Sequence, residues 1–167
     1  MRLCFPGRVI KNLLLWITIF YSGAAMAQDG ASLLITTEED GEYLLEEGVI
    51  LALPQVVLST HTVWTEGLQI FEGPLARDVL GVAGVNTGSL AGKTAKLTAS
   101  NDYAIEIPAE DFVNYDVIIA RKMNGRSMTL RDKGPYWVIY PRDDIPELTD
   151  SRFDHRWVWQ LNKIEVE

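Results

Sequence analysis

The chain has 167 residues, with 15 Lys and Arg against 23 Asp and Glu, which gives a formal net charge of −8 at pH 7. This acidic balance disfavours nucleic acid and anionic lipid as partners, because binding phosphates requires a basic face. The only cysteine, Cys4, lies close to the N-terminus. A chain that loses this segment has no disulfide, no thiol nucleophile and no thiolate metal ligand.

Residues 1–27 predict a secretory signal peptide. Three basic residues precede the apolar run 13–21, and Ala25-Met26-Ala27 supplies small residues before a cleavage site at Gln28. The alternative, an uncleaved membrane anchor, is less favoured because the run is about half of the ~20 residues that span a bilayer. The basic region has no Arg-Arg pair, so we expect export in the unfolded state to the periplasm.

Residues 28–167 are predicted to form a single domain, since 140 residues suffice for one core and not for two ordinary ones. This part carries 12 basic and 23 acidic residues, a net charge of −11. Six of the acidic residues crowd the stretch 38–47, namely Glu38, Glu39, Asp40, Glu42, Glu46 and Glu47. They predict a solvated face, because the ligand order of a calcium loop is absent, and docking of a partner remains open.

The rest of the chain predicts many short strands and few helices. Strand composition or alternation occurs at residues 33–37, 55–60, 68–71, 93–99, 103–108, 117–123, 127–130, 136–140 and 157–166. Between these strands we expect two helical segments, an amphipathic helix at 75–84 and a helical turn at 109–113. Turns are predicted at 49–54 and 134–135, a hairpin turn at 124–125, and a break in the strand at 72–74. Irregular loops are predicted at 142–148 and 151–156. The pattern is typical of an α+β, mostly β domain.

Catalytic and metal motifs are scarce. His61 and His155 are the only imidazoles, and neither lies beside a nucleophile signature such as Gly-x-Ser-x-Gly. Two histidines without paired spacing do not indicate zinc, so we expect surface or capping roles for both. No phosphate-binding loop is present.

Aromatic and polar residues instead gather in three loops that flank predicted strands. Core packing is the commoner role for each aromatic taken alone, whereas three loops of the same composition favour a shared pocket. Carboxylates and amides at its edge suit the amino-pyrimidinone edge of a pterin or guanine-like ring. The candidate ligand-binding residues are Trp64, Ser100, Asn101, Asp102, Tyr103, Arg131, Asp132, Lys133, Tyr136 and Trp137.

The order of several segments resembles the sulfite-oxidase-type molybdopterin-binding fold. Residues 71–80 resemble the strand and helix that open this fold, and later segments follow in the family's order. These are Ala99-Ser100-Asn101-Asp102-Tyr103, Met123-Asn124-Gly125, the turn before Gly134-Pro135, and Arg156-Trp157-Val158. The resemblance implies a sulfite-oxidase-like fold with short helices from about Leu51 to Val166.

Two departures from the family bear on function. The enzymes carry a cysteine that ligates molybdenum, and the corresponding region 97–100 offers none, so the resemblance implies no molybdenum centre. Trp137 stands where the enzymes tend to carry an arginine, which favours an uncharged ring over a phosphorylated cofactor tail.

The chain is thus similar to the small periplasmic, PruR-type pterin-binding proteins. That resemblance implies a non-catalytic receptor that takes a pterin as its ligand. It would contact the periplasmic domain of an inner-membrane sensor that makes or degrades cyclic di-GMP, and would thereby act in biofilm regulation. Two alternatives stay open: a molybdopterin-dependent oxidoreductase, and an interaction module without ligand whose acidic N-terminal region docks on a basic partner.

Overall fold

The computed structural model describes Met1 and residues 30–38 and 41–167. Apart from Met1, the predicted signal peptide lies outside the described residues, as do Glu39 and Asp40 of the acidic stretch. The described helices include none that is long and apolar enough to cross a membrane.

The larger sheet has five strands in the order β2-β1-β11-β5-β6. Its strands are β1 (Ser32–Thr37), β2 (Gly41–Glu46), β5 (Thr94–Ala99), β6 (Ala104–Pro108) and β11 (Leu161–Val166). β1 and β11 run parallel, and the other neighbours are antiparallel. Along β5, Ala95, Leu97 and Ala99 are buried while the threonines and the lysine between them are half-buried, as the alternation of this stretch predicted.

A second sheet has the order β3-β4-β8-β9, and a third consists of β10 and β7. The strands are β3 (Gln55–Thr60), β4 (Gln69–Pro74), β7 (Ile118–Ala120), β8 (Lys122–Met123), β9 (Arg126–Ser127) and β10 (Trp137–Ile139). The predicted hairpin is confirmed, because Asn124 and Gly125 join β8 to β9 with φ of 52° and 74°. Positive φ at both central residues matches the twist of the flanking strands.

The predicted break at Glu72-Gly73-Pro74 is wrong, since β4 runs through all three residues. Gly73 serves close packing rather than a turn: a Cβ atom at this position would lie 2.2 Å from the Ile119 carbonyl oxygen of β7. Glycine therefore lets two backbones approach each other.

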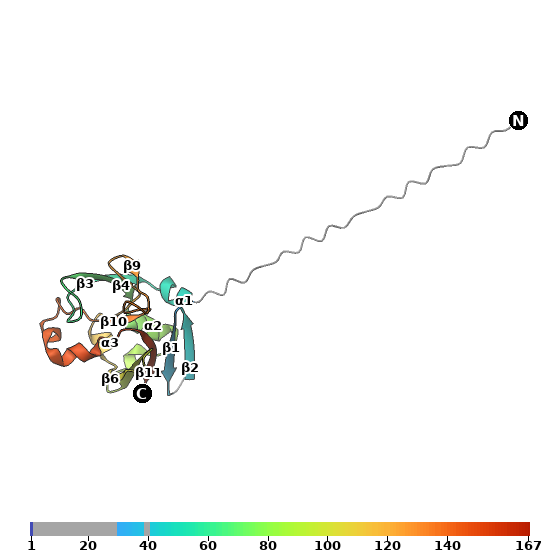
Figure 1. The fold of residues 1–167 in the computed structure, drawn as a ribbon. Helices are drawn as coiled ribbons and strands as arrows, with labels where there is room; N and C mark the ends of the chain where they lie inside the picture. The colour runs from blue at the N-terminus through green and yellow to red at the C-terminus, as the bar shows by residue number, and fades with distance from the viewer. Residues whose placement is uncertain (2–29, 39–40) are drawn as a thin grey trace.

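The helices are short: α1 (Glu47–Ala52), α2 (Ala76–Val82), α3 (Asp111–Asn114), and the 3-10 helices η1 (Thr87–Ser89), η2 (Pro146–Thr149) and η3 (Ser151–Arg156). α2 confirms the predicted amphipathic helix, whereas α1 replaces the predicted turn. Glu47 at the start of α1 pairs with Arg121 at 2.5 Å, so this member of the acidic stretch is not simply solvated. An α+β, mostly β domain is confirmed (Figure 1).

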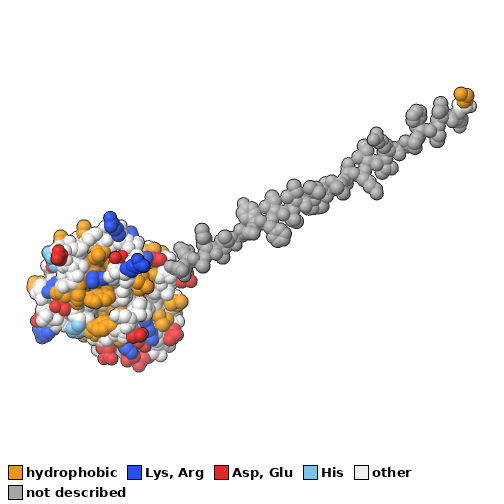
Figure 2. Space-filling view, in the orientation of Figure 1, with side chains coloured by type: hydrophobic (Ala, Val, Ile, Leu, Met, Phe, Trp, Pro, Cys, Tyr) orange, Lys and Arg blue, Asp and Glu red, His pale blue; other side chains and the backbone are white. Residues whose placement is uncertain are grey.

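The core is densest along the aromatic run 136–140. All five of its side chains are 0% exposed, and β10 pairs with the buried strand β7. Figure 2 shows hydrophobic side chains near the centre of one face and acidic side chains gathered along its lower border. The apolar surface and much of the negative charge of this face are therefore separated.

Candidate functional site

Four tryptophans from three segments meet beside β10, and we call them the tryptophan cluster: Trp64, Trp137, Trp157 and Trp159. The ring centroid of Trp64 lies 5.4 Å from that of Trp159, 6.1 Å from that of Trp157 and 6.5 Å from that of Trp137. The Trp64 ring meets those of Trp159 and Trp137 edge to face, the arrangement that the ring quadrupoles favour. Trp137 is the fully buried member of the cluster.

A cavity of about 270 Å³ opens beside this cluster, and we call it the tryptophan cavity. It is lined by Trp64, Ala99, Asn101, Tyr103, His155, Trp157, Val158 and Trp159. Its volume lies just below the ~300 Å³ at which pockets for drug-sized ligands begin. A small flat molecule therefore suits it better than a long one.

Polar donors stand around these aromatic walls. The Asn101 side chain accepts a hydrogen bond from the Tyr103 N–H at 3.1 Å through Oδ1, which leaves its amide group free to donate outward. The Trp157 indole N–H is buried and finds no hydrogen-bond partner within the described part of the chain. A buried donor without a partner costs about 1–3 kcal/mol, and the Asn101 amide is the donor that borders the cavity.

Gln160 joins two of the three predicted loops to the cavity wall. Its N–H donates to the Lys133 carbonyl at 2.9 Å, and its carbonyl accepts from the N–H and the hydroxyl of Ser100 at 2.8 and 3.1 Å. Its side-chain amide donates to the Leu130 carbonyl at 2.7 Å. The residue adopts a φ of 54°, a left-handed conformation that the local sequence does not predict.

The third loop, which carries Trp64, is held from both ends. The Trp64 N–H donates to the Thr62 hydroxyl at 3.1 Å, and this hydroxyl contacts that of Thr65 at 2.8 Å. His61 contacts the Asp143 carboxylate through its N–H and its Nδ1, at 3.0 and 2.7 Å. His61 is therefore a residue that anchors the loop, in keeping with the capping role expected from the sequence.

Lys133, in the charged turn formed by residues 131–133, lies over the tryptophan cluster. Its ammonium nitrogen lies 4.4 Å from the ring centroid of Trp159 and 5.3 Å from that of Trp137. Both distances fall within the ~6 Å of a cation–π interaction. The lysine thus adds a positive charge to an aromatic wall.

The structure brings together six of the ten predicted site residues. Trp64, Asn101 and Tyr103 line the cavity. Ser100, Lys133 and Trp137 adjoin it through the contacts described above. Two of the three predicted loops thus line the cavity, and the third contacts its tryptophan wall through Lys133 and Trp137 without lining it.

The other four predicted residues lie elsewhere, and their predicted place at the pocket is corrected. Tyr136 is fully buried and its hydroxyl donates to the Ala31 carbonyl at 3.2 Å. Burial, with the nearby Glu47 carboxylate, raises the pKa of Tyr136 well above its usual range. Asp102 is exposed at a turn, with a φ of 64°, and does not line the cavity.

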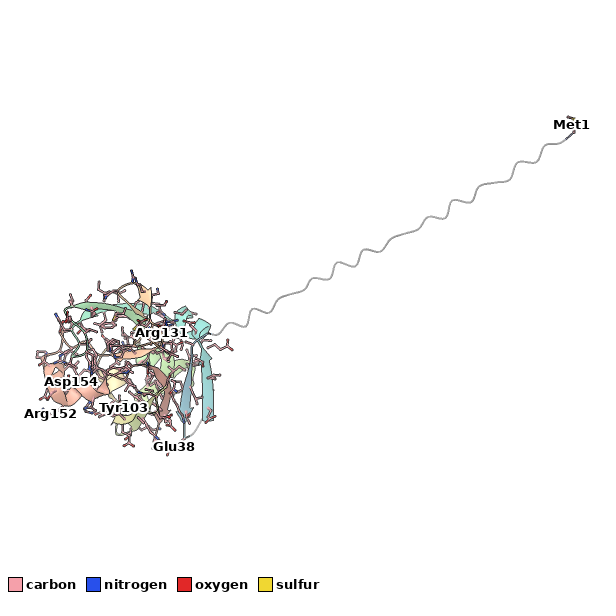
Figure 3. All side chains as sticks on the ribbon, in the orientation of Figure 1. Met1, Glu38, Tyr103, Arg131, Arg152 and Asp154 are labelled. Carbon is pink, nitrogen blue, oxygen red and sulfur yellow. The ribbon has the colours of Figure 1, made fainter. Side chains whose placement is uncertain are left out.

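Asp132 and Arg131 are likewise absent from the cavity lining. The Asp132 carboxylate accepts hydrogen bonds from the hydroxyl and the N–H of Thr129, at 2.9 and 3.2 Å. These bonds lower the pKa of Asp132 and close its own turn. Arg131 is exposed and stands apart from Tyr103 in Figure 3.

The sequence interpretation missed the wall built by residues 155–159. It assigned Trp157 to Trp159 to a long final strand, whereas β11 begins only at Leu161 and a single bridge joins Trp159 to Trp137. The preceding stretch, expected to be irregular, forms η3. Two tryptophans separated by one residue were the available signal, because alternate residues of an extended segment point the same way.

A second aromatic cluster lies behind this wall, and we call it the tyrosine cluster: Tyr115, Tyr140 and Phe153. The Tyr140 hydroxyl donates to the Asp111 carboxylate at 2.9 Å, and Arg156 donates to the same oxygen at 2.5 Å. The Arg156 guanidinium also stacks 4.3 Å from the Phe153 ring centroid. Since Arg156 precedes Trp157, this network fixes the cavity wall to α3.

Comparison with known proteins supports the fold. No protein-family model matches the chain, and no curated protein gives a significant match. Among solved structures, the crystal structure of the sulfane dehydrogenase SoxCD from Paracoccus pantotrophus is similar, with a TM-score of 0.62 and 16% sequence identity. The match covers 81% of this chain and 38% of the SoxCD chain. The sulfite-oxidase-like fold predicted from the sequence is thereby confirmed.

The donor set of the cavity does not fit a metal-bearing cofactor. His155 is the one imidazole in the lining, which contains no carboxylate, no thiol, and no Lys or Arg to pair with a phosphate. The described residues also include no group of three or more His, Cys, Asp and Glu side chains placed to hold a metal ion.

Proposed function

We propose that the tryptophan cavity binds a pterin, and that the protein is a non-catalytic periplasmic receptor for it. The observation that carries this proposal is the cavity itself: about 270 Å³ walled by Trp64, Trp157 and Trp159, with polar donors at its edge. A flat heteroaromatic ring gains stacking energy on such walls, about 1–3 kcal/mol per ring for bases on aromatic side chains.

The polar groups favour a heterocycle over a hydrocarbon. The Asn101 side-chain amide borders the cavity and supplies donors that no protein acceptor takes within the described residues. The ring nitrogens and the carbonyl oxygen of a pterin are acceptors that match them. An apolar guest would leave this amide without an acceptor, so the Asn101 donors favour a polar ring.

The signalling role is proposed from the resemblance to periplasmic pterin-binding proteins together with the predicted signal peptide. Pterin occupancy would be reported to the periplasmic domain of an inner-membrane protein that makes or degrades cyclic di-GMP. A rim formed by Tyr103, which is 48% exposed, and the exposed His155 lies where a bound ring and a partner both reach it.

Titration calorimetry of the purified protein with pterin, its 6-substituted derivatives and their reduced forms tests the binding step. We expect saturable heat and quenching of tryptophan fluorescence, because the rings of the ligand and the cavity stack. Mass spectrometry of small molecules released from the protein as purified identifies the natural ligand. Absence of heat with every pterin, in protein shown to be folded and ligand-free, would refute the proposal.

Two measurements separate the alternatives. Stoichiometric molybdenum or tungsten in the purified protein would favour an oxidoreductase. A silent ligand screen together with salt-sensitive capture of a basic periplasmic domain would favour an interaction module, since screening weakens contacts between exposed charges.

A further inference from the structure

The sheet edges of this protein are protected unequally. Three strands of five or six residues end the two larger sheets: β2, β6 and β3. β2 carries Glu42 and Glu46, and β6 carries Glu106 and Pro108, which are residues that keep other strands from pairing with an edge. β3 contains neither a charge nor a proline in Gln55–Thr60.

The backbone of β3 leaves its outer groups unpaired. The carbonyls of Ile70 and Glu72 accept from the N–H groups of Asn124 and Arg121, so the main-chain groups of these two residues face β8. In an antiparallel ladder the groups of alternate residues point to opposite sides. Phe71 and Gly73 therefore face β3 and pair with Leu58 and Val56.

It follows that the main-chain groups of Gln55, Val57 and Ser59 point away from the sheet. No hydrogen bond joins the N–H or C=O of Val57 or Ser59 to another group in the described part of the chain. The side chains of these residues are also exposed, and Val57 is 65% exposed. On the same face, Ile70 of β4, which pairs with Ser59, is 48% exposed.

We propose that β3 is the interface of a symmetric dimer, in which the β3 strands of two copies pair antiparallel about a two-fold axis at Val57. Val57 then faces Val57 of the second copy, and Gln55 faces Ser59. The two four-stranded sheets become one continuous sheet, and each of these opposed pairs exchanges two main-chain hydrogen bonds. The interface is isologous, as closed dimers require.

The sequence of the edge is self-complementary in this register. Residues 53–61 contain no acidic residue, and the two-fold axis at Val57 places His61 opposite Leu53. On the neighbouring strand, Glu72 is neutralised by Lys122 at 2.5 Å. The strand lies at the outer border of the molecule in Figure 1, away from the acidic side chains along the lower border in Figure 2. Among the residues that this register pairs, like charges therefore do not oppose each other.

Light scattering and sedimentation of the purified protein over a broad concentration range test the dimer. We expect a dimer that Val57→Lys converts to monomer, because two lysines then face each other across the axis. Val113→Lys serves as the control, since Val113 is equally a surface valine, 44% exposed, and lies on α3. Mixing Val57→Lys with Val57→Glu should restore a dimer made of one copy of each.

Cysteine crosslinking tests the register. Opposed residues of a hydrogen-bonded pair have Cα atoms about 5.5 Å apart, within the range that a disulfide spans. We expect Val57→Cys to form a disulfide dimer on mild oxidation and Val113→Cys to stay monomeric, with the crosslinked peptide identified by mass spectrometry.

A monomer at all concentrations with no Val57 crosslink above the control would overturn the proposal. So would a dimer that Val57→Lys leaves intact, or capture of a different protein by this edge in place of the second copy. Pterin binding is measured separately on the Val57→Lys monomer, so neither proposal depends on the other.

Discussion

The tryptophan cluster and the tyrosine cluster share two segments of the chain and differ in how the polar atoms of their rings are paired. The run 136–140 contains Trp137 of the tryptophan cluster and Tyr140 of the tyrosine cluster. The segment 153–159 contains Trp159 of the tryptophan cluster and Phe153 of the tyrosine cluster. Trp157 joins them, with its ring centroid 6.1 Å from that of Trp64 and 6.0 Å from that of Tyr140.

The difference lies in whether the polar atoms of their rings have hydrogen-bond partners. In the tyrosine cluster both phenol groups have carboxylate partners, since Tyr140 donates to Asp111 and Tyr115 donates to Glu147 at 2.6 Å. In the tryptophan cluster the indole N–H of Trp157 has no partner among the described residues, and a cavity opens beside it. Ring hydroxyls that have partners stabilise the fold, whereas an aromatic wall beside a cavity is suited to a ligand.

The largest effect on stability is expected from removing the Asp111 carboxylate, which pairs with Tyr140 and Arg156 beside the tyrosine cluster. Asp111→Ala leaves Arg156 without its carboxylate inside a largely buried network, where the Asp111 side chain is 6% exposed. Removing one member of a buried ion pair costs about 3–5 kcal/mol, so the free energy of unfolding in urea should fall by that amount. Asp116→Ala is the control: its pair with Arg77 has a carboxylate side chain 71% exposed and should contribute about 0–1 kcal/mol. Equal losses in the two variants would show that the network is not what stabilises this region.

The next effect separates binding from stability. Trp159→Leu removes a ring from the cavity wall and should weaken pterin binding by about 1–3 kcal/mol, the contribution of stacking on one aromatic side chain. Phe153→Leu removes a ring from the tyrosine cluster and should lower stability while the affinity for pterin stays unchanged. Calorimetric titration and urea unfolding of both variants check this. A loss of affinity in both would mean that the two clusters do not differ in function.

A smaller effect is expected at the polar edge of the cavity. Asn101→Ala removes an amide that borders the cavity and should weaken pterin binding by about 1 kcal/mol, the net contribution of a typical hydrogen bond. Asp102→Asn changes the charge of the neighbouring residue while keeping a side chain that tolerates its φ of 64°. Asp102 does not line the cavity, so its variant should bind like the unmodified protein. If Asp102→Asn weakened pterin binding more than Asn101→Ala, the ligand would lie on the outer side of the turn that contains these two residues.

Local patterns sufficed for much of the fold and failed where distant segments decide the conformation. The alternation of residues 93–99 and the Asn124-Gly125 turn carry their structure in a few adjacent residues. α1 was missed because Glu47 at its start pairs with Arg121, 74 positions away. The strand through Gly73 was missed because its glycine is required by a neighbouring backbone, that of Ile119, which no local rule reveals.

At the site, composition predicted which loops come together better than it predicted which of their side chains face the cavity. The loops of Trp64, Ser100 and Lys133 do converge, because aromatic and polar residues cluster where strands end. Tyr136 and Trp137 are adjacent in sequence, yet Tyr136 contacts Ala31 while Trp137 contacts Trp64. Two successive residues of a strand point to opposite faces, and the sequence does not state which face borders the cavity. Gln160, which links two of the loops, was missed because its role rests on a backbone conformation.

The smallest effect is expected in the pH dependence of stability, through the Tyr115 phenol of the tyrosine cluster. The hydrogen bond to Glu147, with burial and the neighbouring carboxylates, raises the pKa of Tyr115 from 10.0 to about 12. The folded state therefore keeps this proton over a range in which the unfolded chain releases it, so the resulting stabilisation is complete below pH 10 and is lost as the pH rises to about 12. Tyr115→Phe should make the loss of stability over this range less steep. Glu147→Gln removes the main cause of the shift, so the ultraviolet absorbance of the phenolate should then appear at lower pH. An unchanged titration in Glu147→Gln would mean that the tyrosine cluster is not closed by that bond.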